Sequence, residues 1–132
     1  MFDIEREIAT QPGMWRRAAE IASSGEIPLP HRSERVVALG CGTSWFVAQA
    51  FAARREELGH GVTDAFTPTE LPAGRSYDRA IVISRSGMTT EVVRVIERLK
   101  ADGIPVASVT AVADSPVAAG SDGSIVIDFA DA

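Results

Sequence analysis

RAIVISRSGMTTEVVRVIERLK, residues 79–100, contains a complete strand-to-helix unit. Its first five residues are almost continuously apolar, which is typical of a strand that is buried on both faces of a sheet. Four later apolar residues recur at helical spacing and predict an amphipathic helix over 91–103: Val92, Val95, Ile96 and Leu99. The hydroxyl residues and the glycine between strand and helix fill a core poorly but present hydrogen-bond donors. The turn therefore raises the question of what its donors face.

The same alternation runs through most of the chain. Continuously apolar strands are predicted at 35–40, 61–67, 79–84, 104–110 and 124–129. Between them the sequence predicts helices at 45–59, 91–103 and 115–122, the last with Ser115 as its N-cap, and a loop or irregular helix at 68–78. Strands of this kind alternating with helices indicate an α/β fold with a five-stranded parallel sheet covered on both faces.

Residues 1–27 precede this core and are predicted to form leading helices. Pro12 fits the first turn of the second of them. Small and aromatic apolar residues then recur at helical spacing: Trp15, Ala18, Ala19 and Ala22. A linker with Pro28 and Pro30 leads into the first strand.

The composition excludes several classes of partner. The 132 residues carry a formal net charge of −5 and no Lys/Arg cluster, which disfavours nucleic acid. No apolar run approaches the roughly 18–20 residues that span a bilayer. The single cysteine, Cys41, and the absence of a signal-peptide pattern favour the cytoplasm. His31 and His60 are isolated, so we expect no metal site.

Two turns share one design: GCGTSW, residues 40–45 (the first turn), and SRSGMT, residues 84–89 (the second turn). Each follows a predicted strand and opens a helix, where free N–H groups and the helix dipole favour phosphate. Hydroxyl donors would come from Ser44, Ser84, Ser86 and Thr89. The alternative, that these residues are only helix N-caps, stays open for either turn alone. Because carboxyl ends of parallel strands share one edge, a common pocket explains both turns.

Other motifs fit poorly. In a dinucleotide-binding G-x-G-x-x-G turn the third glycine would stand where this chain has Trp45. The sequence contains neither a P-loop nor a G-x-S-x-G nucleophile elbow. Cys41 has no histidine nearby in sequence, so we interpret it as a small half-buried residue and not as a nucleophile.

Four segments together resemble the SIS (sugar isomerase) phosphosugar-binding domain: EIATQP (7–12), GCGTS (40–44), SRSGMT (84–89) and VTAVADSPVAAGSD (109–122). Within that family the chain is most similar to the isomerase half of glutamine–fructose-6-phosphate aminotransferase and to aldose-ketose isomerase/amino-sugar phosphate deaminase proteins. The resemblance implies a flavodoxin-like three-layer α/β/α sandwich. It also implies that residues 1–132 form a single SIS domain, the first half of a two-SIS protein.

The resemblance further implies a hexose or hexosamine 6-phosphate as ligand, without metal or organic cofactor. The implied ligand contacts are Thr43, Ser44, Ser84, Arg85, Ser86, Gly87, Thr89, Val109 and Thr110. Arg85 and Met88 stand where the synthase has glutamine and glutamate, which argues against synthase activity. Arginine occurs in the isomerase/deaminase branch, where it would add a charged phosphate contact; a solvent-facing role is the alternative.

In two-domain relatives the acid–base residues lie in a second SIS domain or a neighbouring subunit. We therefore expect this chain to be a binding half-site that works as a homo-oligomer or with a second SIS domain. Within the chain itself, Glu70 is the candidate base, while Glu91 fits the ordinary role of a first-turn glutamate. The sequence favours an isomerase/deaminase lineage over a non-catalytic phosphosugar sensor, because residues 1–34 lack a basic recognition helix.

Overall fold

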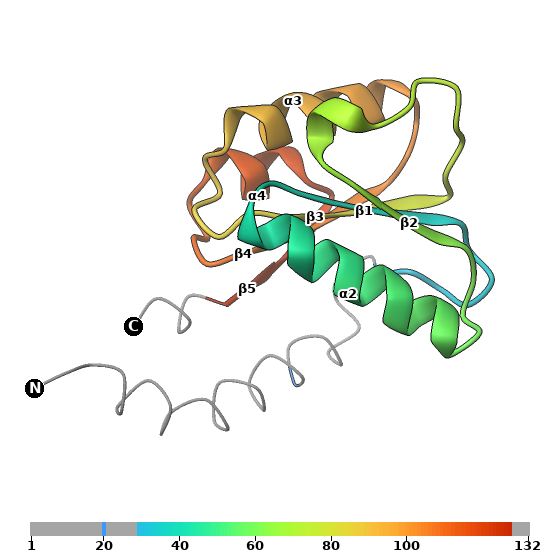
Figure 1. The fold of residues 1–132 in the computed structure, drawn as a ribbon. Coiled ribbons are helices and arrows are strands. Elements are labelled where there is room, and N and C mark those ends of the chain that lie inside the picture. Colours follow the sequence, from blue (N-terminus) through green and yellow to red (C-terminus); the bar gives the residue numbers. More distant parts are fainter. Residues whose placement is uncertain (1–19, 21–28, 128–132) are drawn as a thin grey trace, which may run out of the picture.

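The computed structural model describes Glu20 and residues 29–127, in which five parallel strands form one sheet of order β2-β1-β3-β4-β5 (Figure 1). The strands are β1 (Val36–Gly40), β2 (Thr63–Phe66), β3 (Arg79–Ile83), β4 (Val106–Thr110) and β5 (Gly123–Val126). This order is the flavodoxin-like one, so the predicted α/β class and the five-stranded parallel sheet are confirmed. The predicted leading helices lie outside the described residues, apart from the helical Glu20.

The helices begin close to their predicted positions. They are α2 (Thr43–Glu57), α3 (Thr90–Ala101) and α4 (Pro116–Gly120), with a short 3₁₀ helix η1 (Pro68–Glu70). The start of α2 comes two residues before the predicted 45, so Thr43 and Ser44 belong to its first turn. In the segment 68–78 only η1 is helical. No helix in the described part of the chain is both long and apolar enough to cross a membrane.

The helices lie on the two faces of the sheet (Figure 1). On one face α3, α4 and η1 cover a core that includes Val37, Leu39 and Val82. The predicted apolar stripe of α3 is fully buried there: Val92, Val95, Ile96 and Leu99. On the other face α2 packs on β1 and β2. Alternate residues of each strand therefore face different layers, as the pleat requires.

The order of the strands places a crevice at the carboxyl ends of β1 and β3. These two strands are neighbours in the sheet, with Leu39 opposite Val82 and Gly40 opposite Ile83. The chain leaves β1 toward α2 on one face and leaves β3 toward α3 on the other. In open α/β sheets ligands bind at such a reversal of strand order. The first and second turns both lie there.

At the amino ends of the strands, opposite the crevice, a network of hydrogen bonds surrounds Arg55, which is buried although it is charged. Its guanidinium donates to the carbonyl oxygens of Glu34 (3.0 Å) and His31 (2.8 Å) and to Thr63 Oγ1 (2.9 Å). Arg79 Nε lies 3.0 Å from Glu34 Oε1. This hydrogen bond and the positive charge of Arg79 lower the pKa of Glu34, although partial burial opposes the shift. The network anchors the amino ends of β1, β2 and β3.

Candidate functional site

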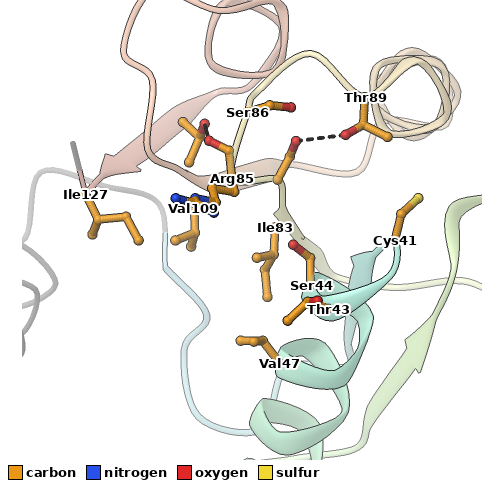
Figure 2. A pocket seen from close by; sticks show the side chains of 12 residues that line it. Cys41, Thr43, Ser44, Val47, Ile83, Arg85, Ser86, Thr89, Val109 and Ile127 are labelled. Atoms are coloured by element: carbon orange, nitrogen blue, oxygen red, sulfur yellow. Dashed lines mark hydrogen bonds between the residues drawn. The ribbon is translucent and has the colours of Figure 1, made fainter. Parts of the chain in front are cut away.

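A cavity of about 770 Å³ opens at the carboxyl edge of the sheet, where the two turns meet (Figure 2). It is lined by Cys41, Thr43, Ser44, Val47, Ile83, Ser84, Arg85, Ser86, Thr89, Val109, Thr110 and Ile127. Every predicted ligand contact except Gly87 is among these residues. The two hydroxyl turns, separated by about forty residues in sequence, therefore share one cavity.

The second turn is held by hydrogen bonds of its own hydroxyl groups. Ser84 Oγ is buried, accepts the Gly87 N–H at 3.1 Å and lies 3.2 Å from Thr89 Oγ1. Ser86 Oγ accepts the Met88 N–H at 3.1 Å. In the pair of Ser84 and Thr89 only one hydroxyl hydrogen is used, whichever residue donates. The other hydrogen remains to be donated to a ligand in the cavity.

The helix that follows this turn has no side-chain cap. Thr89 is the N-cap residue of α3, but its side chain makes no hydrogen bond to the amides of the first turn and points instead to Ser84. The Val93 N–H bonds to the Thr89 carbonyl at 3.0 Å, as the first regular bond of the helix. The amides before it, from Thr90 to Val92, have no acceptor within the helix. Together with the helix dipole they favour an anion.

The start of α2 also lacks a side-chain cap, although the Ser44 and Trp45 N–H groups donate to the carbonyl oxygens of Cys41 and Gly42, each at 3.0 Å. Its N-cap residue is Gly42, which has no side chain, and φ is 57° there. A Cβ atom on Gly40 would lie 2.7 Å from the backbone of Ser44, so only glycine lets the strand end this close to the helix start. Figure 2 shows Thr43 and Ser44 facing the cavity from the beginning of α2.

Gly87 packs the second turn against the start of α4. Its φ is 71°, in the left-handed region that favours glycine, and its carbonyl accepts the Val117 N–H at 3.0 Å. A Cβ atom there would collide with the side chain of Ser115 and come within 3.0 Å of Thr110 Oγ1. The structure thus places Gly87 against the start of α4, outside the lining of the cavity.

The end of β4 is fixed to the second turn. The carbonyl oxygen of Arg85 accepts the Ala111 N–H at 3.0 Å and the Thr110 hydroxyl at 3.3 Å. The Ser84 N–H donates to the Val109 carbonyl at 3.0 Å. These bonds align Val109 and Thr110 with the second turn, which follows β3, and Arg85 lines the cavity with an exposed side chain.

Four lining residues were not predicted: Cys41, Val47, Ile83 and Ile127. Ile83 ends β3 and Cys41 follows β1, so proximity to the turns was a usable signal for both. Burial is the main cause that raises the pKa of the Cys41 thiol, and the negative charge of Glu91 adds to it. The thiol is therefore protonated at neutral pH, which agrees with its interpretation as a small half-buried residue.

The candidate bases lie elsewhere. Glu70 is exposed in η1 and does not line the cavity, and Glu91 is exposed in the first turn of α3. Within the described residues, the lining contains no carboxylate and no imidazole; Arg85 is its charged member. The cavity thus offers donors for an anion, whereas it does not bring together a described acid–base pair.

The family model of the SIS domain matches residues 31–130. The chain belongs to the SIS domain family. The resemblance drawn from its motifs is therefore confirmed, and the cavity described above is the cavity of an SIS domain with a phosphosugar isomerase-like fold.

Similar proteins differ in length from this SIS domain. An uncharacterized protein of Aeropyrum pernix is 36% identical over 99 residues, which are 74% of this chain and 46% of the relative. The chain thus spans about half the length of that relative.

Solved structures show the same architecture. Glucosamine-6-phosphate deaminase from Thermotoga maritima matches 96% of this chain and 40% of its own with a TM-score of 0.75 and 24% identity. An Escherichia coli CFT073 protein in complex with a sugar phosphate matches 95% of this chain and 73% of its own with a TM-score of 0.66 and 24% identity. At this identity both structures show a shared fold.

Proposed function

We propose that this SIS domain binds a hexose or hexosamine 6-phosphate at the carboxyl edge of its sheet, as part of an aldose–ketose isomerase or amino-sugar phosphate deaminase/isomerase. One observation carries the proposal: two helix N-termini without side-chain caps, α2 and α3, meet at one cavity that hydroxyl groups line. The free first amides of α3, the dipoles of both helices and the hydroxyl donors together favour a phosphate.

The roles of the residues follow from their positions. The phosphate accepts hydrogen bonds from the free hydroxyl of the Ser84–Thr89 pair, from Ser86 and from the first amides of α3. Thr43 and Ser44 donate from the opposite side of the cavity, while Val109 and Thr110 flank the sugar. Arg85 adds positive charge at the mouth. The E. coli neighbour, in complex with a sugar phosphate, supports this class of ligand.

Catalysis requires a base that the described lining lacks. An isomerase or deaminase must move a proton at the C1–C2 unit of the sugar, and this needs a carboxylate or imidazole within hydrogen-bond reach. We assign that group to a second SIS domain or a second copy of the chain, which would complete the site. The relative of about twice the matched length is consistent with a two-domain arrangement.

A second function is the sensing of a phosphosugar without turnover. It is favoured because the lining, within the described residues, contains no carboxylate and no imidazole. The two functions differ in one measurement. In deuterated water an isomerase exchanges the C2 proton of glucose 6-phosphate or glucosamine 6-phosphate, whereas a sensor leaves it in place. Proton NMR of the sugar, with and without the protein, detects this exchange where a second copy of the chain supplies the base; where a second SIS domain supplies it, the same assay needs the protein that carries both domains.

Calorimetric titration with glucosamine 6-phosphate and fructose 6-phosphate tests the binding itself, with the unphosphorylated sugars as controls. We expect binding only for the phosphorylated sugars, and an affinity about tenfold lower for Ser86→Ala because a hydrogen bond to a charged group is lost. Ser76→Ala, an exposed serine far from the two turns, is the matched control. Equal binding of the unphosphorylated sugars, or an unchanged affinity in Ser86→Ala, would contradict the proposed phosphate site.

A further inference from the structure

Four aliphatic side chains line the cavity together with its hydroxyl groups: Val47, Ile83, Val109 and Ile127 (the aliphatic wall). Ile83 and Val109 lie opposite one another in register at the ends of β3 and β4. Both pack on the buried cluster that Phe51 of α2 also contacts, so they belong to the face of the sheet that carries α2. The aliphatic wall thus continues the apolar core into the cavity.

The aliphatic wall and the second turn lie at different ends of the cavity. Val47 follows Thr43 by one turn of α2, which is about 6 Å along the helix axis. Figure 2 shows Val47 below Thr43 and Ser44, with Ser86 and Thr89 at the upper end of the view. A ligand whose phosphate is held by the second turn and the first amides of α3 therefore extends its other end toward the aliphatic wall.

The aliphatic wall gives a charged group nothing to pair with. Its carbon atoms neither donate nor accept hydrogen bonds, so an ammonium group placed against them loses hydration without compensation. Val47 is 51% exposed and the other three side chains are half buried, so a ligand there covers apolar surface that otherwise faces water. This end of the cavity favours a neutral group.

The helix starts act in the same direction. α2 begins at Thr43 and α3 begins directly after Thr89, and both threonines line the cavity. Each helix directs the positive end of its dipole toward a ligand in the cavity, which attracts phosphate and repels a cation. This repulsion is independent of the aliphatic wall, and the two effects together disfavour an ammonium group.

Hexose and hexosamine 6-phosphates differ in a group that lies far from the phosphate. The phosphate is attached through C6 to C5, and C2 lies across the sugar ring from C5. At C2, glucose 6-phosphate carries a neutral hydroxyl group, whereas glucosamine 6-phosphate carries an amine that is mostly protonated at pH 7. With the phosphate at the second turn, this substituent is directed toward the aliphatic wall.

We infer that the site selects a neutral hexose 6-phosphate over a hexosamine 6-phosphate, and that the aliphatic wall is the specificity-determining surface. The inference rests on the proposed function and narrows it, because it favours an aldose–ketose isomerase over an amino-sugar phosphate deaminase. Val47 is the member of the wall best suited to a test, since a half-exposed helix position accepts a polar side chain without disturbing the core.

Calorimetric titration of the chain with glucose 6-phosphate and glucosamine 6-phosphate, at pH 7 and at pH 9, tests the selection. An amine whose pKa is about 8 is neutral in about one molecule in ten at pH 7. If the neutral form is the one that binds, glucosamine 6-phosphate should bind about tenfold more weakly than glucose 6-phosphate at pH 7, and within about twofold of it at pH 9.

The outcomes separate the inference from the proposed function. Equal or tighter binding of glucosamine 6-phosphate at pH 7, or a difference that persists unchanged at pH 9, overturns the inference while the proposed function stands. Binding of neither sugar phosphate refutes the proposed function and the inference with it.

Val47→Asp tests the aliphatic wall itself by adding a carboxylate to it. We expect the affinity for glucosamine 6-phosphate, relative to glucose 6-phosphate at pH 7, to rise about threefold over the wild type. Val62→Asp is the matched control, because Val62 is 50% exposed but precedes β2 and does not line the cavity. It should keep the wild-type ratio of the two affinities. An unchanged ratio in Val47→Asp would show that the aliphatic wall does not determine the specificity.

Discussion

The starts of α3 and α4 carry similar residues and use them differently. At α4 the hydroxyl of Ser115 accepts the Ala118 N–H at 3.3 Å and donates to the Val112 carbonyl at 2.8 Å, so its hydrogen bonds are made within the protein. At α3 the hydroxyl of Thr89 turns away from the helix toward Ser84, and the first amides are left without a side-chain acceptor. A hydroxyl residue before a helix thus caps the helix in one case and leaves its first amides without a side-chain acceptor in the other. Residue type alone does not separate them.

The largest expected effect comes from Gly87→Ala, because Gly87 lies where the two helix starts touch. The new Cβ would collide with Ser115 in a backbone conformation at φ 71° that alanine rarely adopts. We expect the free energy of unfolding to fall by about 2–4 kcal/mol and phosphosugar binding to be lost. Urea denaturation and calorimetry measure these effects. Gly74→Ala, where nothing lies within 4 Å of the new Cβ, should leave both unchanged; a similar loss in that control would refute the collision as the cause.

Thr89→Val tests the start of α3, which has no side-chain cap. Valine keeps the shape of threonine but cannot share the hydroxyl pair with Ser84. We expect phosphosugar affinity to fall about tenfold by calorimetry, with the free energy of unfolding within about 0.5 kcal/mol of the wild type. Thr69→Val, exposed in η1, is the control. If stability falls while affinity holds, Thr89 is a structural residue and the contrast with Ser115 disappears.

Ser115→Ala tests the start of α4, which the Ser115 side chain caps. It should lower the free energy of unfolding and leave the affinity nearly unchanged. Loss of an N-cap lowers the free energy of unfolding by about 1 kcal/mol. We expect phosphosugar affinity to change less than about threefold, because Ser115 does not line the cavity. Thermal denaturation and calorimetry of the same preparation provide both values. A tenfold loss of affinity would show that the cap also supports the second turn.

The smallest expected effect concerns the two ends of the strands. The cavity lies at the carboxyl ends, and the ion pair of Arg79 and Glu34 lies at the amino ends. Arg79 lowers the pKa of Glu34, so the folded state holds this carboxylate ionised more strongly than the unfolded state does. The stability that this pair contributes is fully present above the unfolded pKa of Glu34 and is lost as the pH falls through its lower folded pKa.

Denaturant unfolding between pH 6 and pH 3 checks this sign. We expect the wild type to lose more stability over this range than Glu34→Gln, which has no carboxylate to protonate. Glu97→Gln, exposed on α3, should follow the wild type. A steeper loss in Glu34→Gln than in the wild type would reverse the assignment.

The fold could be predicted almost completely because its signals are local. Continuous apolar strands, the stripe of α3 and the cap at Ser115 each depend on residues within a few positions of one another. The two turns also could be predicted as partners, since parallel strands bring their carboxyl ends to one edge.

Other features depend on contacts between distant segments and could not be predicted in this way. The sequence does not show that Gly87 packs against Ser115, or that Arg55 is buried against carbonyl groups 21 and 24 residues away. Likewise the orientation of a hydroxyl decides whether Thr89 caps its helix, and that orientation follows from the packing of Ser84. Glu70, a candidate base by its position after the second strand, is exposed outside the cavity for the same reason, since η1 packs toward α3.

The hydrogen bond between Ser84 and Thr89 can run in either direction. Either hydroxyl can act as the donor in their shared hydrogen bond, so the pair can reverse its direction while every heavy atom stays in place. The turn is already preorganised by the Gly87 amide and by the end of β4, and rotation of two hydrogens is enough to move the free donor from one residue of the pair to the other. The pair can therefore change the position from which its free hydrogen is donated without any rearrangement of the backbone.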